Sequence, residues 1–227
     1  MRGRRCLLVT VTTTAMLAGC GATPVDPAQL LRDAKQSIDS ATSVHFTLTS
    51  QGVTGTGTLI TGGTGDALRP AGFAGSLTVL VAGFPLTVSV VSTGGVFYAR
   101  SPLGGGYTRA DPATYGFGDP AQLLDPSRGL SSLLAGCTGA ATRDADRLNG
   151  EQLDEVACSI PGTLVAALLT SADPSKPVQA TIGVADSNHQ LRRVALVGPF
   201  FDKAHPSTFI VVLDRYGEKV TITPPPG

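Results

Sequence analysis

The sequence predicts an α+β fold in which an antiparallel sheet carries helices on one face. Segments of alternating apolar and polar residues follow one another through short turns rich in Gly and Pro. Such connections join antiparallel strands, because parallel strands need long crossovers. The segments with helical periodicity occur in blocks between groups of strands and do not alternate with them. Each strand has an apolar side, which must therefore be covered by the helices or face a cavity.

The first helix is predicted over residues 27–42, PAQLLRDAKQSIDSAT. Asp26 is suited to cap this helix, and Pro27 is compatible with the first helical position, where an N–H is not needed. Apolar residues then recur at spacings of three and four, which places them on one helical face. This face comprises Leu30, Leu31, Ala34, Ile38 and Ala41.

A change to a two-residue period marks the start of the sheet. In VHFTLTS, residues 44–50, apolar side chains alternate with His45, Thr47 and Thr49, as in a half-buried strand. The same pattern and the turn signal at Asn149-Gly150 predict about nine to eleven strands. The others are expected at 55–61, 76–82, 85–92 and 95–100, on both sides of Asn149-Gly150, and at 178–186, 191–198 and 207–216, with 219–223 as a candidate edge strand.

Two later segments are predicted to be helical. Residues 119–136, DPAQLLDPSRGLSSLLAG, and residues 161–171, PGTLVAALLTS, both carry leucines at helical spacing. Their apolar faces supply the cover that the apolar side of the sheet requires.

The first twenty residues have the pattern of a bacterial lipoprotein signal. Arg2, Arg4 and Arg5 precede an apolar stretch at 6–18 that is too short to span a membrane. The stretch ends in Leu17-Ala18-Gly19-Cys20, which matches the lipobox, the motif in which the cysteine thiol receives a diacylglycerol and becomes the mature amino terminus. The alternative is an ordinary export signal with a cysteine there by chance.

The lipobox predicts the organisation and the location of the chain. We expect a lipoprotein signal peptide at 1–19, a lipidated tether at 20–26 and a single α+β domain at 27–227. Each buried methylene of an acyl chain contributes about 0.8 kcal/mol, so the diacylglycerol and a further acyl group such as palmitate at Cys20 would hold the protein firmly. The mature chain is expected at the outer face of the plasma membrane.

The cysteines left after processing form one pair, because Cys6 leaves with the signal and Cys20 is acylated. In an exported protein, Cys137 and Cys158 are expected to form a disulfide, and two buried free thiols are the alternative. One geometric objection remains. An ideal two-residue turn at Asn149-Gly150 would place Cys137 opposite residue 162, so the bridge requires a bulge, a longer turn or another register.

The composition argues against nucleic-acid binding and catalysis. Lys plus Arg and Asp plus Glu number 17 each, which leaves no basic surface for nucleic acid. The sequence has no HExxH, GxSxG, Walker or CxxC motif, so we expect no enzyme activity, no cofactor and no metal site. His45, His189 and His205 are interpreted as solvated surface residues.

Two other groups of side chains allow more than one interpretation. Acidic residues flank the predicted hairpin between 144 and 155, and a cation there is an alternative to simple solvation. Tyr107, Tyr115 and Phe117 either line an entrance or pack on the sheet.

The order of these features resembles the mycobacterial LppX/LprAFG lipoprotein family. The motifs are the lipobox, a strand beginning Thr42-Ser43-Val44-His45, and the stretch from Leu123-Leu124-Asp125-Pro126 to Leu133-Leu134. They continue with a hairpin closed by Asn149-Gly150 and with Ser159-Ile160-Pro161-Gly162, where the family has GTIPA. The late tryptophan of the family is replaced at Thr181-Ile182, and the pair Cys137 and Cys158 is not part of the family pattern.

The resemblance implies a strongly curved antiparallel β half-barrel with helices packed on its concave face around an apolar cavity. The cavity would bind acyl chains of cell-envelope lipids or glycolipids, which the protein would carry toward the outer envelope. The implied partners are that lipid, the plasma membrane and a membrane lipid exporter, with the protein itself a monomer. The alternative function is a non-catalytic scaffolding or interaction lipoprotein with a filled core.

Strand alternation and helix faces identify the candidate cavity residues, for each of which simple core packing is the alternative. They are Val44, Phe46, Leu48, Leu77, Val79, Leu86, Val88, Val90, Leu130, Leu133, Leu134, Leu164, Leu168, Leu169, Ile182, Val194 and Leu196.

Overall fold

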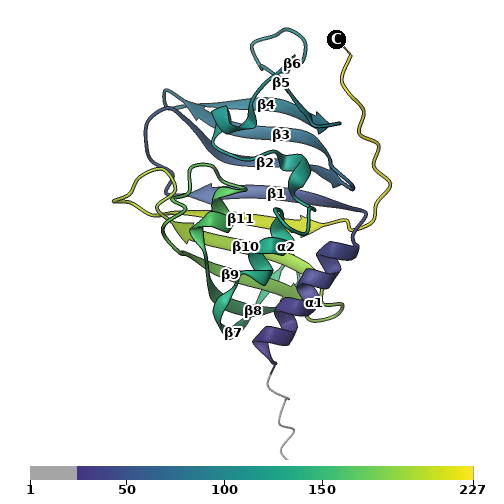
Figure 1. The fold of residues 1–227 in the computed structure, drawn as a ribbon, viewed down its shortest axis with the longest axis vertical. Helices are drawn as coiled ribbons and strands as arrows, with labels where there is room; N and C mark the ends of the chain where they lie inside the picture. The colour runs from purple at the N-terminus through teal and green to yellow at the C-terminus, as the bar shows by residue number, and fades with distance from the viewer. Residues whose placement is uncertain (1–24, 227) are drawn as a thin grey trace, which may run out of the picture.

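The computed structural model describes residues 25–226, and its framework is one antiparallel sheet of eleven strands (Figure 1). The strand order is β6-β5-β4-β3-β2-β1-β11-β10-β9-β8-β7. The strands are β1 (Ser43–Gln51), β2 (Thr58–Leu68), β3 (Gly72–Val81), β4 (Phe84–Thr93), β5 (Val96–Arg100), β6 (Thr108–Arg109), β7 (Thr138–Leu148), β8 (Glu151–Ile160), β9 (Val178–Ala185), β10 (Leu191–Gly198) and β11 (Ser207–Asp214).

The first and last strands of the chain pair at the centre of this sheet. β1 lies between β2 and β11, with Phe46 opposite Leu213 and Leu48 opposite Val211. All the other pairs join strands that are consecutive in the sequence. The sheet therefore consists of two meanders, β1–β6 and β7–β11, that are joined by the β1–β11 ladder.

The sheet is curved and does not close into a barrel, and glycines contribute to the curvature. Gly65 on β2 lies opposite Gly75 on β3. A Cβ at Gly75 would lie 2.2 Å from the carbonyl oxygen of Thr64, so no side chain fits where the two strands approach. The buried ring of Phe73 covers Gly65 in place of a side chain and packs edge-on against Phe46, with 5.4 Å between the ring centroids.

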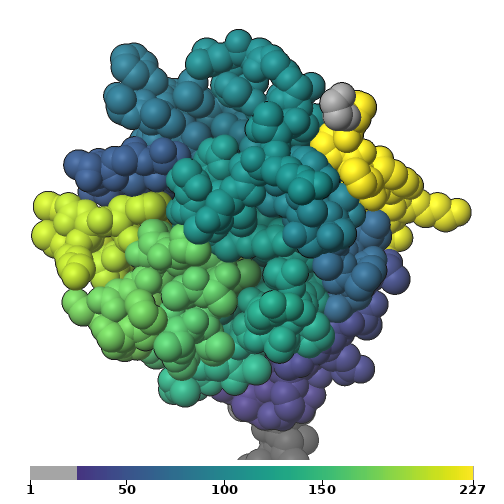
Figure 2. Space-filling model, turned by 45° about the horizontal axis from the view of Figure 1, so that its top comes forward, coloured from purple at the N-terminus to yellow at the C-terminus, as the bar shows by residue number. Residues whose placement is uncertain are grey.

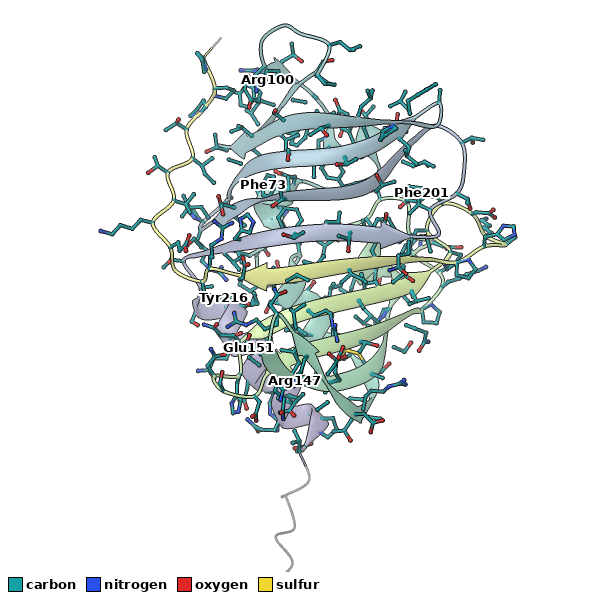
Figure 3. All side chains as sticks on the ribbon, turned by 180° about the vertical axis from the view of Figure 1, so that it is seen from behind. Phe73, Arg100, Arg147, Glu151, Phe201 and Tyr216 are labelled. Carbon is teal, nitrogen blue, oxygen red and sulfur yellow. A yellow bond between two sulfur atoms is a disulfide. The ribbon has the colours of Figure 1, made fainter. Side chains whose placement is uncertain are left out.

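The helices cover one face of the sheet. They are α1 (Pro27–Ser40), α2 (Leu130–Ala135) and α3 (Gly162–Ala166), with two 3₁₀ helices, η1 (Pro112–Tyr115) and η2 (Pro120–Gln122). Figure 1 shows α1 and α2 in front of the lower strands, whereas the opposite face in Figure 3 is open to solvent. The predicted fold class is confirmed.

The first helix forms as its sequence predicts. The Asp26 carboxylate accepts a 3.0 Å hydrogen bond from the N–H of Ala28, and Pro27 is the first helical residue. The helix buries Leu30, Leu31, Ala34 and Ile38, which form part of the core.

Some predicted boundaries were wrong. Residues 219–223 form an extended segment and not a strand. Just before this segment, the hydroxyl of Ser43 donates a 2.6 Å hydrogen bond to the carbonyl of Glu218. β2 continues through its glycines to Leu68, because ladders with β1 and β3 on both sides outweigh the poor strand propensity of Gly. The predicted helix at 119–136 is divided into η2 and α2, and α3 ends at Ala166.

The disulfide forms through a change of register in the β7–β8 hairpin. Leu148 lies opposite Glu151, as a two-residue turn requires, but two register shifts along the ladder bring Thr138 opposite Ser159. Cys137, immediately before β7, then reaches Cys158, with 5.5 Å between the Cα atoms. Continued at this register, the ladder would place Cys137 opposite Ile160, so the bulges remove part of the geometric objection, and Cys137 reaches Cys158 because it lies outside β7.

Candidate functional site

An apolar cavity of about 80 Å³ lies between the concave face of the sheet and the segments that cover it. Its residues come from two sources. The strands supply Phe46, Leu48, Ile60, Leu77, Val194, Leu196, Phe209 and Val211. The covering segments supply Phe117, Gly118, Asp119, Pro120, Leu123, Leu130, Leu133, Leu168 and Leu169.

The sheet side of the cavity is fixed by backbone ladders and by aromatic contacts. Leu196 lies opposite Phe209 in the β10–β11 ladder, and Leu48 lies opposite Val211 in the β1–β11 ladder. The ring of Phe209 packs edge-on against Phe200, with centroids 5.2 Å apart. This wall is therefore part of the main core.

The covering side consists of two chain segments that meet at their backbones. The N–H of Gly118 donates a 2.9 Å hydrogen bond to the carbonyl of Leu168. A Cβ on Gly118 would lie 2.3 Å from the carbonyl oxygen of Ala167, so only glycine fits this contact. Next to it, Phe117 packs against Phe97 and Tyr115, with centroids 5.9 and 6.1 Å apart.

A partly buried polar pair connects the cover to β4. The hydroxyl of Ser92, on the concave face, donates a 2.7 Å hydrogen bond to the carboxylate of Asp119. The same carboxylate oxygen accepts a 3.0 Å bond from the N–H of Ala121 and so caps η2. Asp119 is the charged residue among those that line the cavity.

A second polar contact fixes α2 against α1. The buried hydroxyl of Ser131 donates a 2.6 Å hydrogen bond to Asp39, which also pairs with Lys35. Burial raises the pKa of the Asp39 carboxyl, but the hydrogen bonds from Lys35 and Ser131 outweigh burial, so the net pKa is lowered. These contacts position α2, which supplies Leu130 and Leu133 to the cavity.

About half of the predicted lining residues border this cavity. They are Phe46, Leu48, Leu77, Leu130, Leu133, Leu168, Leu169, Val194 and Leu196. The others pack in or against the core without bordering it: Val44, Val79, Val88, Val90, Leu134 and Ile182 are buried, and Leu86 and Leu164 are partly buried. Alternation shows which side a residue faces, but not how far along the sheet the helices leave a gap.

The prediction omitted several lining residues. Phe209 and Val211 lie on the apolar phase of the last strand, so the alternation that identified the other strands also contained their signal. Gly118, Asp119 and Pro120 belong to a loop without periodicity, and no sequence pattern places them at a cavity. Phe117 both packs on the sheet and borders the cavity, so both interpretations of its role apply.

The prediction that all three histidines are solvated surface residues was wrong for His45. His45 lies on the face of the sheet opposite the cavity, and its Nδ1 is 2.7 Å from Asp66 while its Nε2 is 3.0 Å from the hydroxyl of Thr64. These atoms are connected as in a hydrolytic triad. However, the residues lie on paired strands whose N–H groups are used in the ladders, so no oxyanion hole accompanies them.

Within residues 25–226, no group of three or more His, Cys, Asp or Glu side chains is arranged to hold a metal ion. None of the helices in the same range has the length and apolar character needed to cross a membrane. The predicted signal peptide, the acylated Cys20 and most of the tether lie outside the described residues.

The comparison with known families agrees with this architecture. The model of the LppX_LprAFG lipoproteins matches residues 26–222. The chain belongs to the LppX/LprAFG lipoprotein family. Among relatives in this family, the lipoarabinomannan carrier protein LprG of Mycobacterium tuberculosis is 26% identical over 232 residues, which cover 98% of this chain and 95% of LprG. LprG of Mycobacterium leprae is 27% identical over 228 residues, with 94% and 91% coverage.

Solved structures of this family share the fold. LprF from Mycobacterium bovis superposes with a TM-score of 0.69 at 19% identity and covers 88% of this chain and 97% of its own. LppX from Mycobacterium tuberculosis gives a TM-score of 0.62 at 18% identity, with 87% and 98% coverage. The half-barrel is thus the architecture of the LppX/LprAFG family.

Proposed function

We propose that this protein is a membrane-anchored carrier that takes the acyl chains of a cell-envelope lipid or glycolipid into the apolar cavity and moves them toward the outer envelope. The observation that carries the proposal is a cavity with an almost wholly apolar lining between a fixed sheet and a separate cover. The LprG relatives, which are named as lipoarabinomannan carriers, support the same class of ligand.

Loading requires the cavity to widen. Sites for small ligands usually enclose roughly 300–1,000 Å³, whereas this cavity measures about 80 Å³. Each strand that lines the cavity is hydrogen-bonded to a neighbouring strand on both sides. The covering segments are therefore the part that moves away from the sheet. Acyl chains would then take the place of side chains such as Leu168 and Leu123.

The energetics suit a carrier. Two acyl chains with about 30 methylenes gain roughly 24 kcal/mol when they leave water, at about 0.8 kcal/mol each. They gain almost nothing when they come from a bilayer, because that environment is already apolar. The free-energy changes for loading from one membrane and for release into another are therefore both small.

We assign the protein no catalytic role and no cofactor. Its function rests on the anchor at Cys20, on the lipid and on an exporter that hands the lipid over, with the protein acting as a monomer at the outer face of the plasma membrane. The small cavity favours one alternative, a scaffolding lipoprotein with a filled core.

Lipid recovery separates the two functions. Protein purified from the membrane of its host should give, by native mass spectrometry, adducts with the mass of an acylated lipid, and solvent extraction should release that lipid. A mature protein that never carries more than its own covalent acyl groups would support the scaffold and contradict the carrier.

A further inference from the structure

The turn between β3 and β4 presents exposed apolar side chains at one end of the sheet. Phe84 is 72% exposed and Val81, opposite it in the ladder, is 39% exposed. The hairpin is closed by Ala82 and Gly83, both with positive φ, so the two strands are joined by a tight turn. Figure 2 shows this hairpin as a projection at the upper left of the molecule.

The loop between β1 and β2 extends this apolar surface. Together with the β3–β4 turn, it forms an open hollow of about 530 Å³ with no charged residue in its lining. We call this surface the apolar tip, which comprises Val81, Phe84, Val53, Thr54, Gly55, Thr56, Gly57, Leu59, Leu80, Ala82 and Gly83. Charged side chains, Asp202 and Lys203, occur on the neighbouring loop between β10 and β11.

The apolar tip is connected to the cavity through Phe201. A Cβ at Gly55 would lie 3.3 Å from Cβ of Phe201, and one at Gly116 would lie 3.4 Å from the Phe201 ring. Phe201 in turn packs against Phe209, with centroids 6.0 Å apart, and Phe209 lines the cavity. Contacts of Phe201 with Gly55 and with Phe209 therefore connect the tip to the cavity wall. Figure 3 shows Phe201 at this end of the sheet and Arg147 and Glu151 at the other.

We infer that the apolar tip docks into the surface of a lipid bilayer and brings the covering segments of the cavity to the membrane; this rests on the proposed function. An acyl chain that crossed water between bilayer and cavity would meet a free-energy barrier of about 0.8 kcal/mol for each exposed methylene, which would make its transfer slow. The end of the molecule through which lipid passes must therefore tolerate contact with the bilayer, and an uncharged tip with an exposed Phe does so.

The shape of the tip favours a bilayer over a protein partner. Phe84 stands on a narrow projecting turn, and a soft lipid surface accepts such a side chain without a matching pocket. One aromatic side chain binds a membrane only weakly. The anchor at Cys20 keeps the tip at a high effective concentration near the bilayer, so weak docking is sufficient.

The absence of tryptophan from the sequence allows a direct test. In the acylated full-length protein, reconstituted into phosphatidylcholine vesicles, Phe84→Trp introduces one fluorophore at the tip. Its emission should shift to the blue and be quenched several-fold by dibrominated phosphatidylcholine. The matched control is Leu103→Trp, an exposed apolar position in the loop between β5 and β6, which lies outside the apolar tip and away from the tethered start of α1 and should show neither effect. Equal emission and quenching at the two positions would overturn the inference.

A second variant separates docking from lipid binding. Phe84→Ser should slow the transfer of a fluorescent phospholipid between vesicles several-fold and leave the lipid content of the purified protein and its melting temperature unchanged. If the purified wild-type protein contained no lipid, the proposed carrier function would be contradicted. The tryptophan fluorescence of Phe84→Trp would still show whether the apolar tip docks into the bilayer. In the full chain with Cys20→Ala and without vesicles, a blue shift of Phe84→Trp that grows with protein concentration would assign the tip to a second copy and overturn membrane docking.

Discussion

The N–H of Gly118 and the carbonyl of Leu168 form a 2.9 Å hydrogen bond that joins the two covering segments over the cavity. The segments come from separate parts of the chain, one before α2 and one after α3. Their contact is close enough to exclude a methyl group. Any widening of the cavity that separates these segments must break this bond.

Gly118→Ala should loosen the cover. The added Cβ meets backbone oxygen at 2.3 Å, which cannot turn away as a side chain can. We expect a loss of about 1–3 kcal/mol in the free energy of unfolding and faster amide exchange at residues 112–122 and 164–172. Hydrogen exchange with mass spectrometry measures this effect. Gly106→Ala is the control, because open space surrounds that position, and equal exchange in both variants would contradict the role of the contact.

Leu168→Trp should separate lipid binding from stability. Leu168 borders the cavity and is only partly buried, so a larger side chain there occupies ligand volume at small cost to the melting temperature. Ile182→Trp is the matched control, because Ile182 is fully buried away from the cavity, and overpacking there should cost about 1–3 kcal/mol or more.

Lipid content by native mass spectrometry and a melting curve for each variant decide this prediction. For Leu168→Trp we expect lost lipid and nearly unchanged melting. Lowered melting in both variants, with no lipid on the wild type, would favour the filled core.

Asp39→Asn should destabilise the protein in a pH-dependent way. The folded pKa of Asp39 lies below its ordinary value of 3.8, so the charged form contributes stability above that pH, and the contribution is lost as the pH falls through the folded pKa. At pH 7 the variant should lose about 1 kcal/mol through its weaker bonds to Lys35 and Ser131.

Urea denaturation at pH 7 and pH 2.5 tests this expectation. The difference between wild type and variant should shrink at the lower pH. Asp144→Asn, on the exposed edge strand β7, serves as the control, and a difference at Asp39 that persists unchanged at pH 2.5 would contradict the assignment.

Cys137→Ser should lower stability through the loss of the disulfide. The bridge spans 21 residues, and a loop of this length predicts a loss of about 3 kcal/mol on the chain-entropy model. Chemical denaturation with and without reductant provides the measurement. The wild type under reducing conditions should resemble the variant, and a variant as stable as the oxidised wild type would show that the bulged hairpin holds without the bridge.

Cys20 should carry the lipid anchor. Mass spectrometry of the membrane fraction is expected to find Cys20 as the mature amino terminus with a diacylglycerol on its sulfur. Cys20→Ala should leave the folded domain intact but release it from the membrane or block its processing. Cleavage at another residue, or an unmodified Cys20, would remove the anchor from the proposed function.

The sequence by itself determined the local structure and the chemistry of this protein. Asp26 and Pro27 start α1, the alternation around Phe46 and Leu48 marks β1 as half-buried, and Asn149-Gly150 closes the last hairpin before α3. Each of these features depends on residues a few positions apart, which is the range over which propensity and periodicity act.

Only the tertiary structure decided where the cavity lies. Pairing of β1 with β11 brings Leu48 next to Val211, although most of the chain separates them in sequence. Gly118 meets Leu168 although no sequence pattern links the two segments. The bulges that bring Cys137 toward Cys158 likewise depend on the packing of the whole hairpin. The physical reason is that packing, and not local preference, sets which apolar residues fill the core and which are left around a gap between sheet and cover.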